Sequence, residues 1–469
     1  MAARRRSCCQ KGGAEGEGEV RDGGRRWGPG AGAGPGGGAG AGAGGGAGGG
    51  GGAAEEMEVL LWYKYTRVAD LRGEAAAQRA LAARLGLLGR VLVAAEGFNG
   101  TLSGPPDAVR SYVEAVRADA RMADIDFKFS PAAGGHPFPD LVVKEVAELV
   151  SSGGKFSQLQ VPQEQYADTG GAGAIVGRHL APQDFHAALQ AFYDGREAAA
   201  AKRRRLEGVA VGGETQAGLP EEEEKEEPGA LPSEGPVLLD VRNKKEYEVG
   251  RFRGAVDMKA DTFSEIARWL EKHTDDLRGR PIMMYCTGGI RCEKASAFLR
   301  SQGEGFEDVS QLKGGIHRYL EAFEDGGHFG GKNFVFDRRL VQPTPPVAGC
   351  GSSGGGAGEV VGRCVECQGA WETIDWERVC SVCRGLVMVC DACFAARGGE
   401  SHCHKHRHLR DLYFQNLERF SPEELRRQAA ELGKLETSLR GTKSLRKKRA
   451  TLRKQVAKVE AHLAARAGA

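Results

Sequence analysis

Residues 282–299 read IMMYCTGGIRCEKASAFL, and this stretch decides the fold of the central part of the chain. An apolar run, two glycines and an alanine-rich run follow one another, which predicts a buried strand, a tight loop and a helix. Cys286 leaves the strand, and Arg291 lies where the helix is expected to begin. Gly288 and Gly289 allow the backbone to curl so that successive N–H groups point at the sulfur. These donors, the helix N-terminus and the arginine would lower the pKa of the thiol and stabilise a thiolate or persulfide.

The size of this loop favours sulfur chemistry over phosphate chemistry. A phosphatase loop of the Cys-to-Arg type is one residue longer and forms a wider cradle. The loop between Cys286 and Arg291 contains four residues, Thr287, Gly288, Gly289 and Ile290. The alternative is a buried structural cysteine ahead of a helix. Cys292 would either resolve a persulfide as a disulfide or face the core as a small hydrophobic residue.

The segments that flank the loop resemble the rhodanese family. LDVRN at 239–243, with Glu246 and Gly250, is similar to its first strand and following turn, and FRGA at 252–255 is similar to its Gly-Ala corner. Residues 309–312, followed by two glycines, resemble its last strand, whereas Tyr319 stands where many rhodaneses carry Trp. The resemblance implies that Cys286 and Arg291 are catalytic, and that the supporting residues are Asp240, Arg242, Glu246, Cys292 and Glu293.

Three segments resemble the bacterial TrhO-type tRNA uridine hydroxylases and their eukaryotic rhodanese-domain relatives. They are YCTGGIRCEK at 285–294, the stretch from Arg90 through EGFNGTLSG at 96–104, and KNFVFDRR at 332–339. The resemblance implies oxygen-dependent 5-hydroxylation of a wobble uridine, with tRNA as partner, molecular oxygen as co-substrate and Cys286 as the essential thiol. Phe98 departs from the Ile that is usual in the family. Asn99 and Gly100 mark the family's signature turn, and the alternative is a simple tight turn.

The chain is expected to be an α/β protein of several domains. A β-α-β-β-α-β order between residues 57 and 146 predicts a ferredoxin-like α+β domain, with strands that include 58–65, 125–129 and 141–146. After residue 236 helices and strands alternate, as in a parallel α/β sheet. The expected parts are a disordered Gly/Ala-rich head (1–56), the ferredoxin-like domain with a connecting helix at 182–193 (57–193), a charged linker or insertion (194–235), the rhodanese domain (236–345), a linker (346–359), a Cys/His-rich zinc module (360–410) and a basic helix (420–465).

A cluster of cysteine and histidine residues predicts zinc near the C-terminus. Seven of the 12 cysteines lie between residues 364 and 403, mostly as C-x-x-C pairs. The first two pairs have a spacing close to that of a zinc ribbon, and the third pair with Cys403 and a histidine would complete a second, structural site. The alternative is free thiols beside a solvated His-rich tail, and the spacing does not say which residues share an ion. The candidate ligands are Cys364, Cys367, Cys380, Cys383, Cys390, Cys393, Cys403, His402 and His404.

The C-terminal helix combines heptad-spaced leucines with basic residues. Leu425, Leu432 and Leu439 are seven residues apart, which predicts a short coiled coil or packing against the same chain. Basic side chains between the later repeats would contact RNA phosphates or form a solvated charged face, namely Arg446, Lys447, Lys448 and Arg449.

Composition and apolar patterning indicate where the protein is located more than what it does. The chain contains 71 glycines and has a formal net charge of only +2, so bulk charge does not indicate nucleic-acid binding. No apolar run reaches the length of a membrane span, and the head has no apolar region of a secretory signal. We expect a cytoplasmic protein with no membrane contact, with a plastid or mitochondrion as the alternative. The sequence does not indicate an oligomeric state.

Three functions remain open from the sequence. The leading hypothesis is a tRNA-modifying oxidoreductase whose Cys286 acts in uridine hydroxylation. The second is a sulfurtransferase that carries a persulfide on Cys286, taken from thiosulfate or from a donor protein. The third is a non-catalytic, zinc-containing scaffold, against which the intact CTGGIR loop argues.

Overall fold

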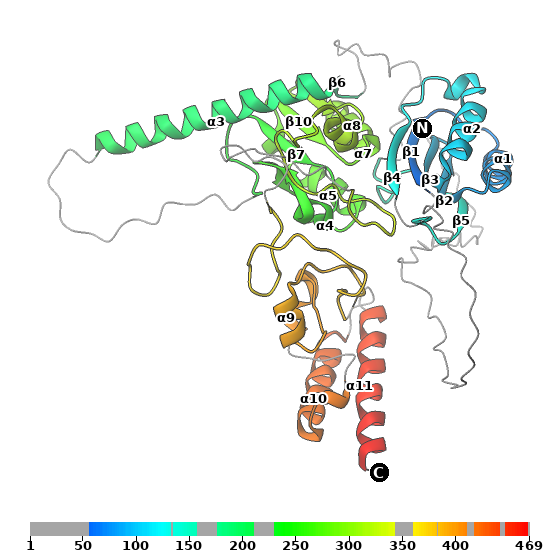
Figure 1. Cartoon of the computed structure of the whole chain (residues 1–469). Coiled ribbons are helices and arrows are strands. Elements are labelled where there is room, and N and C mark those ends of the chain that lie inside the picture. The colour runs from blue at the N-terminus through cyan, green and yellow to red at the C-terminus, as the bar shows by residue number, and fades with distance from the viewer. Residues whose placement is uncertain are drawn as a thin grey trace, which may run out of the picture. The chain divides into compact units, whose positions relative to one another are not determined.

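The computed structural model describes residues 56–132, 135–156, 176–210, 229–342, 360–381, 383–409, 417–440 and 446–467 (Figure 1). The predicted head before residue 56, the linker at 346–359 and positions 211–228 of the predicted insertion lie outside the described residues. Within those residues, no helix combines the length and the apolar character that crossing a membrane requires.

The N-terminal domain is the ferredoxin-like fold that the sequence predicts. Its sheet has the order β4-β1-β3-β2-β5, in which β1, β3, β2 and β4 pair antiparallel and β5 is added parallel to β2. The helix α2 buries Val109, Tyr112, Val113 and Val116, an amphipathic spacing that fits one sheet face. The elements are β1 (Met57–Tyr65), α1 (Leu71–Arg84), β2 (Leu88–Ala94), β3 (Gly97–Gly104), α2 (Pro106–Arg117), η1 (Ala120–Met122), β4 (Lys128–Ala132) and β5 (Leu141–Glu145).

The signature segment EGFNGT is a strand and not the predicted turn-rich corner. The turn is formed by Ala95 and Glu96, and β3 already begins at Gly97. Asn99 pairs with Tyr63 of β1 on one side and with Leu92 of β2 on the other. Gly100 is required for space, because a Cβ atom there would overlap the indole of Trp62. The strand prediction at 125–129 is likewise displaced, since β4 begins at Lys128.

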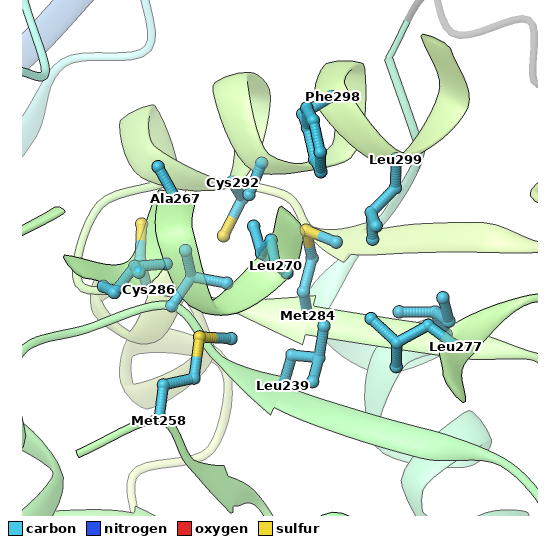
Figure 2. Close-up of a cluster of buried hydrophobic side chains, with 14 of the residues drawn as sticks. Leu239, Met258, Ala267, Leu270, Leu277, Met284, Cys286, Cys292, Phe298 and Leu299 are labelled. Carbon is cyan, nitrogen blue, oxygen red and sulfur yellow. The ribbon is translucent and has the colours of Figure 1, made fainter. Parts of the chain in front are cut away.

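The central domain is the predicted parallel α/β sheet, with strand order β6-β11-β10-β7-β9. All four residues of β7, β10 and β11 are buried, as expected for strands covered on both faces. One face packs against α5 and α7 (Figure 2), and the other packs against α3 and α8. The elements are β6 (Arg178–Leu180), α3 (Pro182–Ala210), β7 (Val237–Asp240), α4 (Lys244–Val249), β8 (Gly250–Phe252), β9 (Val256–Asp257), α5 (Phe263–Lys272), α6 (Thr274–Leu277), β10 (Ile282–Tyr285), α7 (Ile290–Ser301), β11 (Val309–Leu312), α8 (Gly315–Ala322) and β12 (Phe329–Gly331), which pairs with β8.

The predicted boundary at residue 193 is wrong. β6 pairs with β11, and Phe185, Leu189 and Phe192 of α3 pack into the core of the central domain, so this segment belongs to the rhodanese sheet. The helix also continues to Ala210, into the predicted linker. The polar run there consists largely of Ala, Glu, Lys and Arg, which are strong helix formers.

The C-terminal part contains a small cysteine-rich module and two helices. The module has the short helices α9 (Asp391–Ala396) and η3 (His404–Leu409), and its Ile374 and Met388 pack against Val249, Phe334 and Leu340. After η4 (Leu417–Arg419), α10 (Pro422–Ser438) and α11 (Arg446–Ala467) form a helical pair. The predicted packing of the leucine repeat on its own chain is therefore confirmed, by two small cores around Leu432 with Leu452 and Leu425 with Val459.

Candidate active site and metal centres

Cys286 lies in the loop between β10 and α7, and its side chain is fully buried. The backbone N–H of Gly289 donates to its Sγ at 3.1 Å, and the backbone N–H groups of Arg291 and Cys292 help to lower the pKa of the thiol. Gly289 has a φ of 105°, a conformation that glycine adopts without strain. One donor of the predicted ring, the N–H of Gly289, is thus placed on the sulfur.

The surroundings of Cys286 favour the thiolate. Burial by itself would raise the pKa of this thiol, but hydrogen bonding from the Cys292 thiol, the charge of Arg291 and the backbone donors lower the pKa to about 5. Burial and the neighbouring Cys286 raise the pKa of Cys292, so Cys292 keeps its proton. Both residues are free thiols in the core beneath α7 (Figure 2). Cys292 therefore faces the core, in the same cluster as Cys286.

Arg291 is fixed by a buried ion pair with Glu246. Its Nη1 and Nη2 donate to the two carboxylate oxygens at 2.8 and 2.7 Å, in a forked arrangement. Nη2 also donates to the Thr287 hydroxyl at 2.9 Å, and that hydroxyl donates to Glu246 at 2.8 Å. Burial alone would raise the pKa of Glu246, but the charge of Arg291 lowers this pKa to about 2. The carboxylate is therefore ionised throughout the neutral range.

Asp240 and Arg242 form a second buried pair, which supports the strands that carry the loop. Arg242 Nε and Nη2 donate to the two oxygens of Asp240 at 2.8 and 2.6 Å. The hydroxyl of Tyr285, the residue before Cys286, donates to Asp240 at 2.6 Å. Arg242 Nη2 also donates to the Gly250 carbonyl at 2.6 Å. The pair thus ties the ends of β7 and β10 to the following turn.

Glu293 joins the first turn of α7 to the N-terminal domain. Its carboxylate accepts a hydrogen bond from the Tyr63 hydroxyl of β1 at 3.1 Å and from Gln311 at 3.0 Å, and it pairs with His179 Nε2 at 2.8 Å. A Cβ atom on Gly289 would lie 2.7 Å from the Tyr63 hydroxyl, so the second loop glycine makes room for this contact.

A buried lysine on α7 makes a second link to the N-terminal domain. Lys294 is fully buried and pairs with Glu96 at 2.8 Å, and its Nζ donates to the Val150 carbonyl at 3.2 Å. Sequence patterns did not indicate Tyr63, His179, Gln311 and Lys294 as parts of the site. Among their partners, only Glu96 belongs to a segment that the sequence singled out, EGFNGT.

Further positive charge approaches the thiol from β4. Lys128 is buried, pairs with Asp126 at 2.9 Å and lies 5.4 Å from the centre of the Tyr63 ring. Burial lowers the pKa of Lys128, and Asp126 and the Cys286 thiolate act in the opposite direction. His317 is also buried, and burial together with Lys128 and two arginines lowers its pKa to about 3. His317 is therefore a neutral imidazole at physiological pH.

The cysteine-rich module contains two groups of side chains that can hold metal ions. The ligand atoms of each group lie within 4.8 Å of one another. Ligands of the two groups alternate along the chain. The first C-x-x-C pair shares a group with the third pair, and the second pair shares a group with Cys403. The groups are Cys364, Cys367, Cys390 and Cys393, and Cys380, Cys383, Cys403 and His406.

The grouping of ligands, which the spacing left open, is not the zinc-ribbon arrangement that the first two pairs suggested. The second C-x-x-C pair does not join the first, and neither His402 nor His404 belongs to a group; the histidine is His406, 3.2 Å from Cys403 Sγ. Each of the first two C-x-x-C pairs lies in a hairpin-like loop, and in each loop a glycine stands two residues after the second cysteine. Cysteine spacing indicates such loops but not which loop meets which.

The basic residues of α11 are partly engaged within the chain. Arg449 Nη2 pairs with Glu436 of α10 at 2.9 Å, and Arg453 pairs with the same carboxylate at 2.8 Å. Arg446 is exposed, whereas the side chains of Lys447 and Lys448 lie outside the described residues. RNA contact by this helix stays a prediction.

Three family models match successive parts of the chain, and the rhodanese match begins after β6 and α3. Residues 57–149 match the UPF0176 acylphosphatase like domain, residues 225–322 the rhodanese-like domain and residues 330–406 the rhodanase C-terminal family.

Relatives are found in plants and bacteria. Rhodanese-like domain-containing protein 6 of Arabidopsis thaliana is 33% identical, and the match covers 72% of this chain and 51% of that protein. A tRNA uridine(34) hydroxylase of Bacillus velezensis is 33% identical, covering 62% of this chain and 74% of that protein. One from Listeria welshimeri is 35% identical, with the same coverage. The chain thus spans about half of the plant relative and about three quarters of the bacterial ones.

We predict that Cys286 ionises with a pKa of about 5. The measurement is the far-ultraviolet thiolate absorbance of the full chain as a function of pH, from which the signal of Cys286→Ser is subtracted. Arg291→Met should raise the midpoint by about 1–3 units, because it removes a cation and leaves the Glu246 carboxylate. Arg300→Met, on the far end of the same helix, should leave the midpoint unchanged. A wild-type midpoint near the ordinary value of 9.0 would contradict the assignment.

We predict two metal ions per chain, one for each group of ligands. Cys364→Ser and Cys380→Ser should each release about one ion, measured by elemental analysis of the purified full chain. His406→Ala should weaken the second site, and His404→Ala serves as the matched control that retains both ions. Loss of an ion from His404→Ala and not from His406→Ala would refute this arrangement of ligands.

Proposed function

Because this chain belongs to the tRNA uridine(34) hydroxylase family, we propose that it hydroxylates C5 of the wobble uridine of tRNA, with Cys286 as the required thiol. The single observation that supports this most is that a thiol with a pKa of about 5 is enclosed jointly by the rhodanese loop and the N-terminal domain. A rhodanese loop needs no such partner domain to hold a sulfur anion, so the second domain suggests a larger substrate.

The proposed chemistry begins with attack of the Cys286 thiolate at C6 of uracil. The new C–S bond moves electron density to C5, which becomes nucleophilic. Dioxygen then supplies one oxygen atom to C5, a two-electron donor and two protons reduce the other oxygen to water, and release of the C5 proton and the thiolate restores the aromatic base. Arg291 and the loop N–H groups hold the sulfur as an anion before attack and after release.

Access to the thiol constrains the substrate. Cys286 is fully buried, so a uridine would have to leave its stack and enter as a single base. The anticodon loop is single-stranded, which makes that step less costly than in a duplex.

A second candidate function is persulfide transfer. The sulfur accepts a hydrogen bond from the Gly289 N–H, and Arg291 follows after four loop residues, a cradle suited to a sulfur-sized anion. In this proposal the Cys286 thiolate attacks the outer sulfur of thiosulfate or of a protein persulfide, the S–S bond of the donor breaks, and sulfite or the donor thiolate leaves. An acceptor thiolate then takes the outer sulfur of the Cys286 persulfide, and the Cys286 thiolate is released.

We propose that the two ligand groups of the module hold zinc. One offers four thiolates and the other three thiolates and an imidazole, which are the donor sets of structural zinc sites. Four protein ligands leave no open position, so zinc would stabilise the module and not react. The module packs against Val249, the last residue of the α4 helix that also carries Glu246, and this contact connects the stability of the module to the thiol loop.

The hydroxylase proposal predicts complementation of a bacterium that lacks its own wobble-uridine hydroxylation. Wild-type protein should restore 5-hydroxyuridine-derived nucleosides in digested tRNA, detected by mass spectrometry, and Cys286→Ser should not. Arg300→Met, which removes a cation from the far end of α7, is the control that should restore them. If soluble, metal-loaded wild type restored none, the hydroxylase proposal would fail and sulfur transfer to Cys286 would become the better candidate.

A further inference from the structure

A half-exposed phenylalanine lies at the outer edge of the thiol loop. Phe334 and Phe336 follow β12, with ring centres 5.3 Å apart in an edge-to-face arrangement. Phe334 is buried in the contact with the cysteine-rich module, whereas Phe336 is 51% exposed. Among the described residues only two other large hydrophobic side chains are comparably exposed, Phe129 and Trp376. Exposing an aromatic ring costs solvation free energy, and such rings often mark binding surfaces.

The ring of Phe336 is surrounded by cationic groups. The Arg291 guanidinium carbon lies 5.8 Å from the ring centre, and Lys245 Nζ lies 5.4 Å from it. Arg338 is exposed two residues later, and its carbonyl accepts a hydrogen bond from the Trp376 indole at 3.3 Å. We call this surface, made of Lys245, Phe336, Arg338 and Trp376, the Phe336 patch.

The patch is connected to the reactive thiol through one side chain. Arg291 contacts Phe336 and also pairs with Glu246 and Thr287 inside the loop, and its charge lowers the pKa of Cys286. A ligand stacked on the exposed face of Phe336 would therefore lie next to Arg291, the residue whose charge acts on the Cys286 sulfur.

We propose that the Phe336 patch binds single-stranded RNA beside the reacting uridine, with a neighbouring base stacked on Phe336 and phosphates paired with Lys245 and Arg338. The inference rests on the proposed function and adds the position of substrate recognition. An aromatic ring stacks on any base, and flanking cations neutralise the backbone, which is the usual construction of single-strand binding surfaces. A protein partner would not require cations on this side of the ring, so the charges favour RNA.

The chain offers a matched control for this patch. Phe129 on β4 is 38% exposed, but a shallow hollow that it lines also contains Glu56 and Glu58, whose charges repel phosphates. Phe129→Ala thus removes a ring of similar exposure from a surface where RNA is not expected. Phe336→Trp is the conservative variant, since it keeps an aromatic face.

The test is the affinity of the full chain for a fluorescent RNA hairpin with a single-stranded, uridine-containing loop, measured by anisotropy at several salt concentrations. Phe336→Ala should weaken binding by roughly 5- to 150-fold without changing the salt dependence, because it removes stacking and no phosphate contact. Arg338→Ala should reduce the slope of log affinity against log salt by about one. Phe336→Trp and Phe129→Ala should bind as wild type does.

The outcomes separate this proposal from the hydroxylase proposal. If Phe336→Ala binds the hairpin as tightly as wild type, the patch does not recognise RNA and is left as a surface for a protein. That result stands whether or not wild type forms hydroxyuridine in tRNA. If Phe336→Ala loses affinity while wild type forms no hydroxyuridine, the patch is upheld and the reaction is wrong. The thiolate absorbance midpoint of Phe336→Ala should equal that of wild type, which shows that the loop remains intact.

Discussion

The buried ion pair between Glu246 and Arg291 is the interaction on which the rest of the site depends. Glu246 lies in the first turn of α4 and Arg291 in the first turn of α7, so the pair connects two separate strand-to-helix turns at one edge of the sheet. Removing one partner of such a pair leaves an uncompensated buried charge, which typically costs about 3–5 kcal/mol. The pair also holds Thr287 by two hydrogen bonds, and so determines the path of the loop around the sulfur.

Arg291 acts on both sides of the thiol loop, toward the core and toward solvent. Toward the core its charge offsets the burial that would otherwise keep Cys286 protonated. Toward solvent it lies under the ring of Phe336. The N-terminal domain closes the remaining side, since Tyr63 reaches Glu293 and Lys294 reaches Glu96. The thiol site is thus built from residues of both domains.

Much of this could be predicted from the sequence, because some signals are local. A short apolar run before two glycines and an arginine fixes the strand, the loop and the donors at the sulfur. Other features depend on partners far apart in the chain. β6 has only three residues, Arg178–Leu180, and no apolar run, so its place in the rhodanese sheet could not be predicted. Asn99 and Gly100 resembled a turn, but the strand is decided by pairing on both sides and by the indole of Trp62. Likewise, His406 becomes a candidate ligand through the crossing of two cysteine loops, which spacing does not encode.

In the proposed function, the buried thiolate of Cys286 serves oxygen insertion into a tRNA base. The most direct measurement is to incubate the purified full chain, an electron donor and unmodified tRNA under dioxygen labelled with oxygen-18, and to analyse the digested nucleosides by mass spectrometry. We expect 5-hydroxyuridine that carries the heavy isotope in wild-type reactions and none with Cys286→Ser. Hydroxyuridine that takes its oxygen from water, or equal product from both proteins, would contradict this proposal.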